Sequence, residues 1–391
     1  MLESVEMNEE TCWLLKALKE TILNTSYRRL FYKLKVCKRE LDKPIQRIPD
    51  QLGYDSYIMF LEAVSNKLID QTTYQEAWSD QEPGLEPTPD KHKADSSPVG
   101  QLVDIPTQFL VEEAHYCQKR PNLQVIAYVH SAIINIQQRD DIRATWGNAS
   151  AYDLGNISVQ VGLVFMVGRV KSSWERHIVQ EESQHYHDIV QGDYVDHYHH
   201  LSYKALASLY WINKHCSHVP WTLHADDDAH VDIFLFYRAL QELDDYHRQR
   251  FVCYQIRSPV FRSGRWKVSY DEYPAEVYPR HCAGPVWFLQ TKLIPRLLEA
   301  SKVVPFLWVD DVYITGVLAN NAGIKILTFN KYFDIRKNDP RSIGKKVVWF
   351  SQIIPSRFWW KKILSYHRKN SMHFEFPATI ISKGEVTDLT V

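Results

Sequence analysis

The spacing of hydrophobic and polar positions changes near residue 105. From there on, short apolar runs alternate with longer amphipathic stretches. Short apolar runs bounded by turn residues predict buried strands, and apolar residues at a period of 3.6 predict helices. Strands that alternate with helices favour an α/β domain with a largely parallel sheet. The predicted strands are Leu123–His130, Val159–Val167, Trp221–Ala225, Phe251–Ile256, Val286–Leu289 and Ile324–Thr328, and the predicted helices are Ser131–Thr145, Tyr198–His215, Asp232–Tyr246, Thr291–Ser301 and Asp310–Asn320.

The N-terminal part of the chain has a different pattern. Tyr54, Ile58, Leu61 and Val64 form an apolar stripe at helical spacing, so residues 1–78 are predicted to be a small helical region. Residues 79–104 are rich in proline and charge and poor in large apolar side chains, which is the composition of a flexible linker. Residues 105–391 then form the main domain.

Composition narrows the classes of function. The chain has 391 residues, of which 45% are hydrophobic, and its net charge of −1 gives no indication of a nucleic-acid partner. No apolar run is long enough to span a membrane, and the N-terminus does not resemble a signal peptide. The six cysteines contain no CxxC pair, which argues against a zinc ribbon. Such scattered cysteines are most often buried and reduced, although their even number permits disulfides.

Three adjacent carboxylates, Asp226 to Asp228, follow the apolar run Trp221–Ala225. In an α/β sheet, ligands bind beyond the carboxyl ends of the strands, so the triplet lies where a ligand site is expected. Mg²⁺ and Mn²⁺ prefer oxygen ligands such as these. Because side chains alternate along an extended strand, Asp226 and Asp228 are predicted to share one metal-binding face. A solvated acidic turn is the alternative interpretation of the triplet taken alone.

Further segments carry candidate chemistry. Arg139 and Arg143 are four residues apart, so on a helix they share a face that either pairs with neighbouring carboxylates or binds an anion. Lys204 lies on the predicted helix that leads to the acidic strand end. Asp310 and Asp311 open an apolar helix, where they are helix caps or catalytic groups. A histidine-rich segment shows no convincing zinc-ligand spacing; its histidines are His185, His187, His197, His199 and His200.

Taken together, these segments resemble the β-1,3-glycosyltransferase family of galactosyl- and N-acetylglucosaminyltransferases, glycosyltransferase family 31. The resemblance covers roughly residues 123–330, and five motifs occur in the family's order. The matches are Arg139–Gly147 to R-x-x-I-R-x-T-W-G, Asp226–Asp228 to the metal-binding DDD, Tyr278–Gly284 in part to Y-P-x-Y-x-x-G, Asp310–Gly316 to E-D-V-[YF]-x-x-G, and Asp193, Tyr194, Asp196, Tyr198, Leu201 and Lys204 to the stretch that precedes the DDD.

The resemblance implies a GT-A-like fold, a Rossmann-type mixed sheet flanked by helices. It implies transfer of galactose or N-acetylglucosamine from a UDP-sugar to a glycan acceptor in β-1,3 linkage, with inversion and with Mn²⁺ or Mg²⁺. Asp226 and Asp228 are then the metal ligands, and Asp311 is the base that deprotonates the acceptor hydroxyl. Residues expected to support the nucleotide are Arg139, Arg143, Lys204, Asp226 and Asp227. The family is normally anchored in the Golgi by one membrane helix, which is not readable in this sequence.

The sequence departs from the family pattern in three places. Ala229 and His230 replace an apolar pair, Asp310 replaces a glutamate, and His281 and Pro285 change the loop at 280–285. The changed loop motivates an alternative, a catalytically inert relative that binds a nucleotide sugar or a glycan. A metal-dependent phosphoryl-transfer enzyme also uses clustered aspartates, but no glycine-rich phosphate loop is present.

Overall fold

The computed structural model describes residues 101–152, 154, 158–170, 173–264, 266–334, 340–350 and 356–370. The predicted helical region 1–78 and most of the predicted linker 79–104 lie outside these residues, so this division stays a prediction. The chain separates into two compact units, one holding residues 95–170 and 186–391 and the other including 171–185. Residues 171–185 contain most of helix α6, Ser173–Tyr186. The description below concerns the larger unit.

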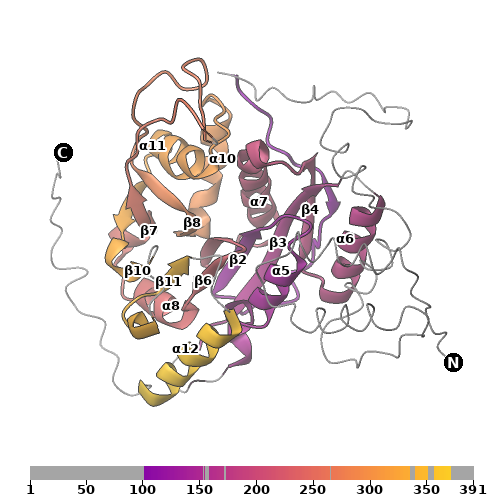
Figure 1. The fold of residues 1–391 in the computed structure, drawn as a ribbon, viewed down its shortest axis with the longest axis vertical. Helices are drawn as coiled ribbons and strands as arrows, with labels where there is room; N and C mark the ends of the chain where they lie inside the picture. Colours follow the sequence, from indigo (N-terminus) through magenta and orange to yellow (C-terminus); the bar gives the residue numbers. More distant parts are fainter. Residues whose placement is uncertain are drawn as a thin grey trace, which may run out of the picture. The chain divides into compact units, whose positions relative to one another are not determined.

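An eight-stranded mixed sheet organises this unit, with strand order β1-β4-β3-β2-β5-β8-β7-β9 (Figure 1). Strands β4, β3, β2 and β5 run parallel, whereas β8 pairs antiparallel with both β5 and β7. The strands span Phe109–Val111 (β1), Val125–His130 (β2), Val161–Arg169 (β3), Ile189–Val195 (β4), Trp221–Asp226 (β5), Arg250–Ile256 (β7), His281–Gln290 (β8) and Lys325–Thr328 (β9).

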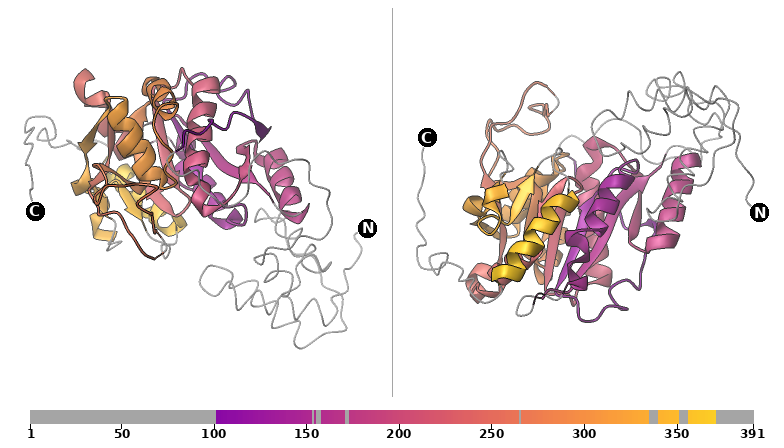
Figure 2. Two further views of the ribbon diagram at one scale, coloured as in Figure 1. Left: turned by 90° about the horizontal axis from the view of Figure 1, so that it is seen from above. Right: turned by 60° about the horizontal axis from the view of Figure 1, so that its bottom comes forward.

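Helices connect the parallel strands. Going from β2 to β3 the chain moves one way along the sheet, and going from β4 to β5 it moves the other way. Right-handed crossovers therefore place α5 (Ile136–Arg143) and α7 (Leu201–His215) on opposite faces (Figure 2). The remaining helical segments are the 3₁₀ turns Trp146–Ala151, Tyr198–His200, Thr291–Leu293, Asn330–Tyr332 and Pro340–Ser342, the α-helices α8 (Ile233–Gln241), α9 (Asp245–Arg248), α10 (Ile294–Ser301), α11 (Ala319–Asn321) and α12 (Ser356–Asn370), and the π-helix η4 (Val312–Leu318).

A second, three-stranded sheet lies beyond the acidic triplet. It consists of β6 (Ala229–Val231), β10 (Phe333–Asp334) and β11 (Val348–Phe350), in the order β10-β11-β6. Helix α12 runs beside α5 (Figure 2). Its His367 contacts both carboxylate oxygens of Asp232 at 2.8 Å, and Asp232 also accepts the Leu235 N–H at the start of α8. This buried pair fixes the segment that follows the triplet.

Two disulfides cross-link the unit, Cys117–Cys216 and Cys253–Cys282. The expectation that the scattered cysteines are reduced is therefore wrong for these four. Both bonds lie in the core, where all four cysteines are fully buried. The second bond joins β7 to the start of β8, so it fixes the loop that leads into β8.

The predicted fold class, an α/β domain with a mixed sheet flanked by helices, is confirmed. The six predicted strands are all present within a few residues, but the sheet is mixed: β4-β3-β2-β5 and the pair β7-β9 are parallel, whereas β1 and β8 pair antiparallel with their neighbours. The predicted helix Asp232–Tyr246 is divided into α8 and α9, and the predicted helix Ser131–Thr145 begins only at Ile136. No helix among the described residues has the length and apolar character needed to cross a bilayer.

Candidate active site

The candidate site forms where β2 and β5 end side by side. These strands are parallel neighbours, and their register places His130 opposite Asp226. Strand β2 is buried throughout, and β5 is buried up to Ala225. The polar residues at the ends of these strands therefore lie at the sheet edge, next to the hydrophobic core. Asp226 is the last residue of β5, and Asp227 and Asp228 form the turn into β6. The triplet is therefore not extended throughout, and strand alternation does not govern Asp228. The metal assignment itself stays a prediction.

Asp227 is held by the loop that follows β2. Its Oδ2 accepts hydrogen bonds from the Ser131 hydroxyl at 2.8 Å and from the Asn135 amide at 2.9 Å. Arg139 in turn donates to the Ser131 oxygen at 2.9 Å and to the carbonyl oxygens of Ala132 and Ile133 at 2.6 and 2.9 Å. Arg139 is 1% exposed. It therefore shapes the loop that positions the triplet, and a direct role at a nucleotide stays a prediction.

Lys204 reaches the same loop from α7. Its buried Nζ donates to the backbone oxygen of Ser131 at 2.9 Å and to Asp196 Oδ1 at 2.8 Å. The ammonium group also lowers the pKa values of Asp226 and Asp227, against the larger opposing effect of burial. Lys204 is thus a fixed positive charge behind the triplet. Its predicted contact with a diphosphate is not tested by these contacts.

Arg143 is engaged at the start of β4. Its Nε and Nη2 atoms donate to the two oxygens of Asp188, each at 2.7 Å, and Nη1 donates to Asp140 at 3.0 Å. The guanidinium carbon also lies 3.9 Å from the centre of the Tyr186 ring. This set of contacts corresponds to pairing with neighbouring carboxylates, the first of the two roles considered for Arg143. Its predicted role in the nucleotide pocket stays a prediction.

Asp310 and Asp311 come to the same place from the segment before η4. Asp310 Oδ2 lies 3.7 Å from His130 Nδ1. Asp311 Oδ1 accepts the Val312 N–H at 2.7 Å, which caps η4, and a side-chain carbon at Gly284 would lie 3.6 Å from its Oδ2. Strand β8 is tied to η4 because the Cys282 N–H donates to the Thr315 hydroxyl at 2.8 Å. Gly284 thus lies directly beside the Asp311 carboxylate.

The carboxylates lie close together and are partly buried. Burial raises the pKa values of Asp310 and Asp311 to about 7, and the negative charge of Asp226 adds to both shifts. Burial and the charge of Asp227 raise the pKa of Asp226 as well. Because a divalent cation bound among these groups would remove their mutual repulsion, the residues fit a metal ion with oxygen ligands.

Two buried histidines complete the polar cluster, and the sequence did not single them out. His130 and His224 have ring centres 4.5 Å apart, and His224 stacks on Trp287 at 3.6 Å. His224 Nε2 lies 3.7 Å from Asp226 Oδ1. The sequence offers one signal, for His224 alone. It comes two residues before Asp226, so the side chains of His224 and Asp226 lie on the same face of β5. The five histidines between residues 185 and 200 do not form a comparable metal-ligand group within the described ranges.

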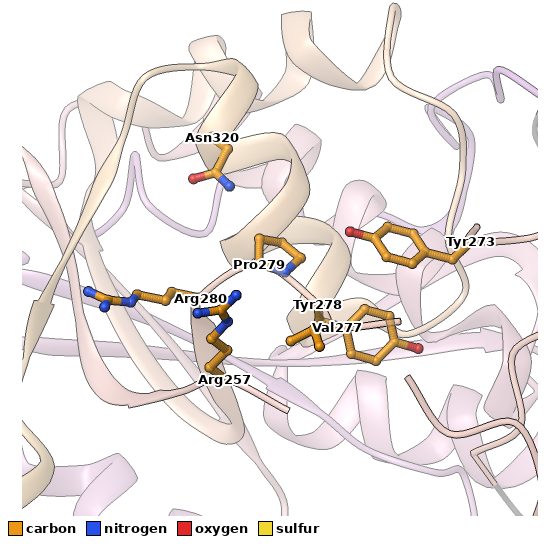
Figure 3. A pocket seen from close by; sticks show the side chains of 7 residues that line it. All are labelled: Arg257, Tyr273, Val277, Tyr278, Pro279, Arg280 and Asn320. Carbon is orange, nitrogen blue, oxygen red and sulfur yellow. The ribbon is translucent and has the colours of Figure 1, made fainter. Parts of the chain in front are cut away.

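A polar cavity of about 450 Å³ lies beside the loop that precedes β8 (Figure 3). Pro279 of this loop packs against Gly316 of η4. The lining residue Tyr278 lies near Asp311, because the charge of Asp311 adds to the burial that raises the pKa of Tyr278. His281, one of the changed loop residues, is buried, and its Nδ1 lies 2.8 Å from the Pro279 carbonyl oxygen. The cavity is lined by Arg257, Tyr273, Val277, Tyr278, Pro279, Arg280 and Asn320.

Known proteins share this region. Residues 137–330 match the galactosyltransferase family. A Mus musculus protein, beta-1,3-galactosyltransferase 2, is 29% identical over 219 residues, which are 54% of this chain and 50% of that protein. A Homo sapiens lactosylceramide 1,3-N-acetyl-beta-D-glucosaminyltransferase is 29% identical over 225 residues, 56% of this chain and 59% of that protein.

The chain therefore spans only about half of the length of these two relatives. Among solved structures, the apo form of the bifunctional glycosyltransferase WbbM is 9% identical, covers 59% of this chain and 46% of its own, and has a TM-score of 0.34, too low to carry an argument. The sequence matches confirm the resemblance that the five motifs predicted.

Proposed function

Because residues 137–330 are a glycosyltransferase domain of the galactosyltransferase family, we propose that this protein transfers a hexose from a UDP-sugar to a glycan acceptor. We propose galactose or N-acetylglucosamine as the sugar, a β-1,3 linkage, and inversion at the anomeric carbon. The observation that carries the proposal is the position of Asp226 beside Asp310 and Asp311 at one sheet edge, where the charge of Asp226 adds to the burial that raises the pKa values of both other carboxyl groups.

In this proposal Asp226 and Asp228 hold Mn²⁺ or Mg²⁺. Such an ion, when bound, neutralises the negative charge that develops on the diphosphate as UDP leaves. Ser131 and Asn135 keep the Asp227 carboxylate fixed beside these ligands. Arg139 fixes that loop from behind, and Lys204 supplies positive charge on the same side. Arg143 supports the nucleotide pocket indirectly, through its hydrogen bond to Asp188.

Asp311 is the proposed general base. An inverting displacement needs a group opposite the leaving diphosphate to take the proton from the acceptor hydroxyl. The Val312 N–H orients Oδ1 of Asp311, while Oδ2 lies next to Gly284. A pKa raised to about 7 by burial is close to the pH at which a base is most effective. The cavity beside Tyr278 and Arg280 lies on this side and is the proposed acceptor subsite.

We also propose that the protein works in the Golgi lumen, associated with the membrane as the family implies. The two disulfides support an oxidising compartment, because disulfides seldom persist in the cytosol.

A transfer assay tests the proposal. UDP-galactose and UDP-N-acetylglucosamine are each offered with Mn²⁺ to a panel of glycan acceptors, with and without EDTA. Activity is expected with Mn²⁺ and should disappear with EDTA, and UDP binding is measured in parallel by calorimetry. Asp228→Ala should abolish transfer and weaken UDP binding only when metal is present.

Asp245→Ala is the matched control, because Asp245 is an exposed aspartate on α9. Turnover that persists in EDTA would contradict the role of the triplet. Tight UDP binding without turnover on any acceptor would instead support the inert relative that the changed loop at 280–285 suggests.

A further inference from the structure

We propose that His130, His224 and Asp310 form a binding site for a transition-metal ion such as Zn²⁺. This site is additional to the carboxylate metal site proposed above and does not depend on transfer activity. The three side chains come from the end of β2, from β5 and from the segment before η4, so distant parts of the chain build the site. Their donor atoms lie within 4.8 Å of one another.

The geometry is close to that of a bound ion. His130 Nδ1 and Asp310 Oδ2 are 3.7 Å apart, and the two imidazole rings meet edge to face at an angle of 77°. Around a tetrahedral Zn²⁺, with ligand bonds of about 2.0–2.2 Å, donor atoms are roughly 3.3–3.6 Å apart. The three donors, which lie within 4.8 Å of one another, would therefore move closer together when they coordinate an ion.

Apart from the Gly284 backbone near the His224 ring, the described residues offer the ring nitrogens of the two histidines no close partner. His130 is 5% exposed and His224 is fully buried, and none of their four nitrogens makes a hydrogen bond of ordinary geometry. Stacking on Trp287 accounts for the position of the His224 ring but gives its nitrogens no partner.

The donor set favours one class of ion. Imidazole nitrogen suits Zn²⁺, Cu²⁺, Fe²⁺ and Ni²⁺, whereas Mg²⁺ and Ca²⁺ take oxygen ligands. An ion can reach the site from the carboxylate side, since the Asp310 side chain is 17% exposed and that of Asp226 is 40% exposed. Asp226 Oδ1 lies 3.7 Å from His224 Nε2, so Asp226 or a water molecule completes the coordination.

Metal binding tests the site directly in the full chain. The protein is freed of metal with EDTA, exchanged into buffer, and titrated with Co²⁺ by calorimetry and visible spectroscopy. The carboxylate site proposed above can also bind Co²⁺, so the signal assigned to this site is a Co²⁺ with the intense visible bands of a four- or five-coordinate ion. Zn²⁺ should remove these bands, and Mg²⁺ at the same concentration should not. A spectrum of six-coordinate Co²⁺ alone, or loss of the intense bands with Mg²⁺, would overturn the proposal.

Variants separate this site from its neighbours. His130→Asn and His224→Gln should each weaken Co²⁺ binding at least about 100-fold, since loss of groups that only support metal ligands already costs about 10–100-fold. His218→Gln, at an exposed histidine, should leave Co²⁺ affinity within about twofold. Unchanged affinity in both His130→Asn and His224→Gln would overturn the assignment.

X-ray absorption of the Zn²⁺-loaded parent protein needs no variant and stays informative if the histidine variants do not fold. Scattering from two imidazole rings is expected, and a spectrum of oxygen ligands alone would contradict the site. These measurements do not involve UDP or an acceptor, so their outcome does not depend on whether transfer activity is found.

Discussion

The indole Nε1 of Trp146 donates a hydrogen bond of 3.1 Å to the carbonyl oxygen of Ala229, the residue that follows the acidic triplet. Asn135 and Ser131 hold Asp227, the middle residue of the triplet. The segment that ends in the T-W-G motif therefore fixes the triplet at two points. Its glycine, Gly147, is needed for packing, because a side-chain carbon there would lie 2.6 Å from Leu163.

Asn135→Ala tests this positioning role. The change removes one of two side-chain donors to Asp227, and a hydrogen bond to a charged group is worth about 1.5–3 kcal/mol. We expect transfer activity to fall about 10- to 100-fold while the melting temperature moves by no more than a few degrees. The same measurements on Gln137→Ala provide the control, because Gln137 contacts Asp141 instead. Full activity in Asn135→Ala would show that the carboxylate does not need this donor.

Asp311→Asn separates the base from the helix cap. The amide keeps an oxygen that can accept the Val312 N–H, so the cap should survive, but it has no useful proton affinity. Turnover should fall by about 10²–10⁴. Folding, melting temperature and binding of UDP with Mn²⁺ should stay near the parental values. If the variant keeps more than about a tenth of parental turnover, the base lies elsewhere and Asp310 is the next residue to test.

His367→Ala should destabilise the fold strongly. The imidazole is the partner of Asp232, whose side chain is fully buried, so its loss leaves a buried carboxylate without its main partner. Such a loss costs about 3–5 kcal/mol of unfolding free energy. Arg357→Ala on the same helix is the control, because its contact with Asp141 is half exposed and worth at most about 1 kcal/mol. Urea unfolding distinguishes the two, and equal stabilities of the two variants would contradict the role of the buried pair.

His230 should make the metal-free protein less stable in acid. Burial lowers its folded pKa to about 4, whereas the unfolded value is near 6.5. Below pH 6.5 the unfolded chain binds a proton that the folded chain does not, so the contribution to stability is present above pH 6.5. It is lost progressively as the pH falls towards 4, and it amounts to roughly 3 kcal/mol.

Comparison of the parent with His230→Gln isolates this contribution from the oppositely shifted carboxylates. In urea unfolding with EDTA, the stability of the parent relative to the variant should decrease by up to roughly 3 kcal/mol between pH 7 and pH 4. A difference that stays constant over this range would mean that the folded pKa of His230 is not lowered.

The strands were predictable because their cores are continuous apolar runs, as in β2 and β5. Strand β4 was missed because Gln191, Gly192 and Asp193 interrupt its apolar pattern, although Gln191 is buried and donates to the Gly168 carbonyl oxygen. Helix α12 was missed although Trp360, Ile363 and His367 follow helical spacing. In both cases a polar side chain is buried because a distant residue satisfies it, and the local pattern does not contain that information.

The same limit applies to the site. The sequence indicated that Asp226 ends a strand and that Asp311 starts a helix, and both positions agree with the structure. It predicted a helix from Ser131, but the chain there forms the loop that holds Asp227. Arg139 and Lys204 donate hydrogen bonds to the carbonyl oxygens of this loop, so these oxygens do not need helical partners. It also gave no sign that His130 and His224 meet, since their contact depends on the pairing of strands far apart in the chain.

The Cys117–Cys216 bond closes a loop of 99 residues that contains β2, the arginine motif and α7. By the chain-entropy argument, a cross-link of this span restricts the unfolded chain by an amount worth about 4–5 kcal/mol, which is comparable to the whole margin of stability of many domains. A host that keeps thiols reduced would thus produce a chain that lacks this stabilisation, and the domain that carries the site would be more prone to misfold. Recombinant production through an oxidising secretory route is the corresponding choice for every experiment above.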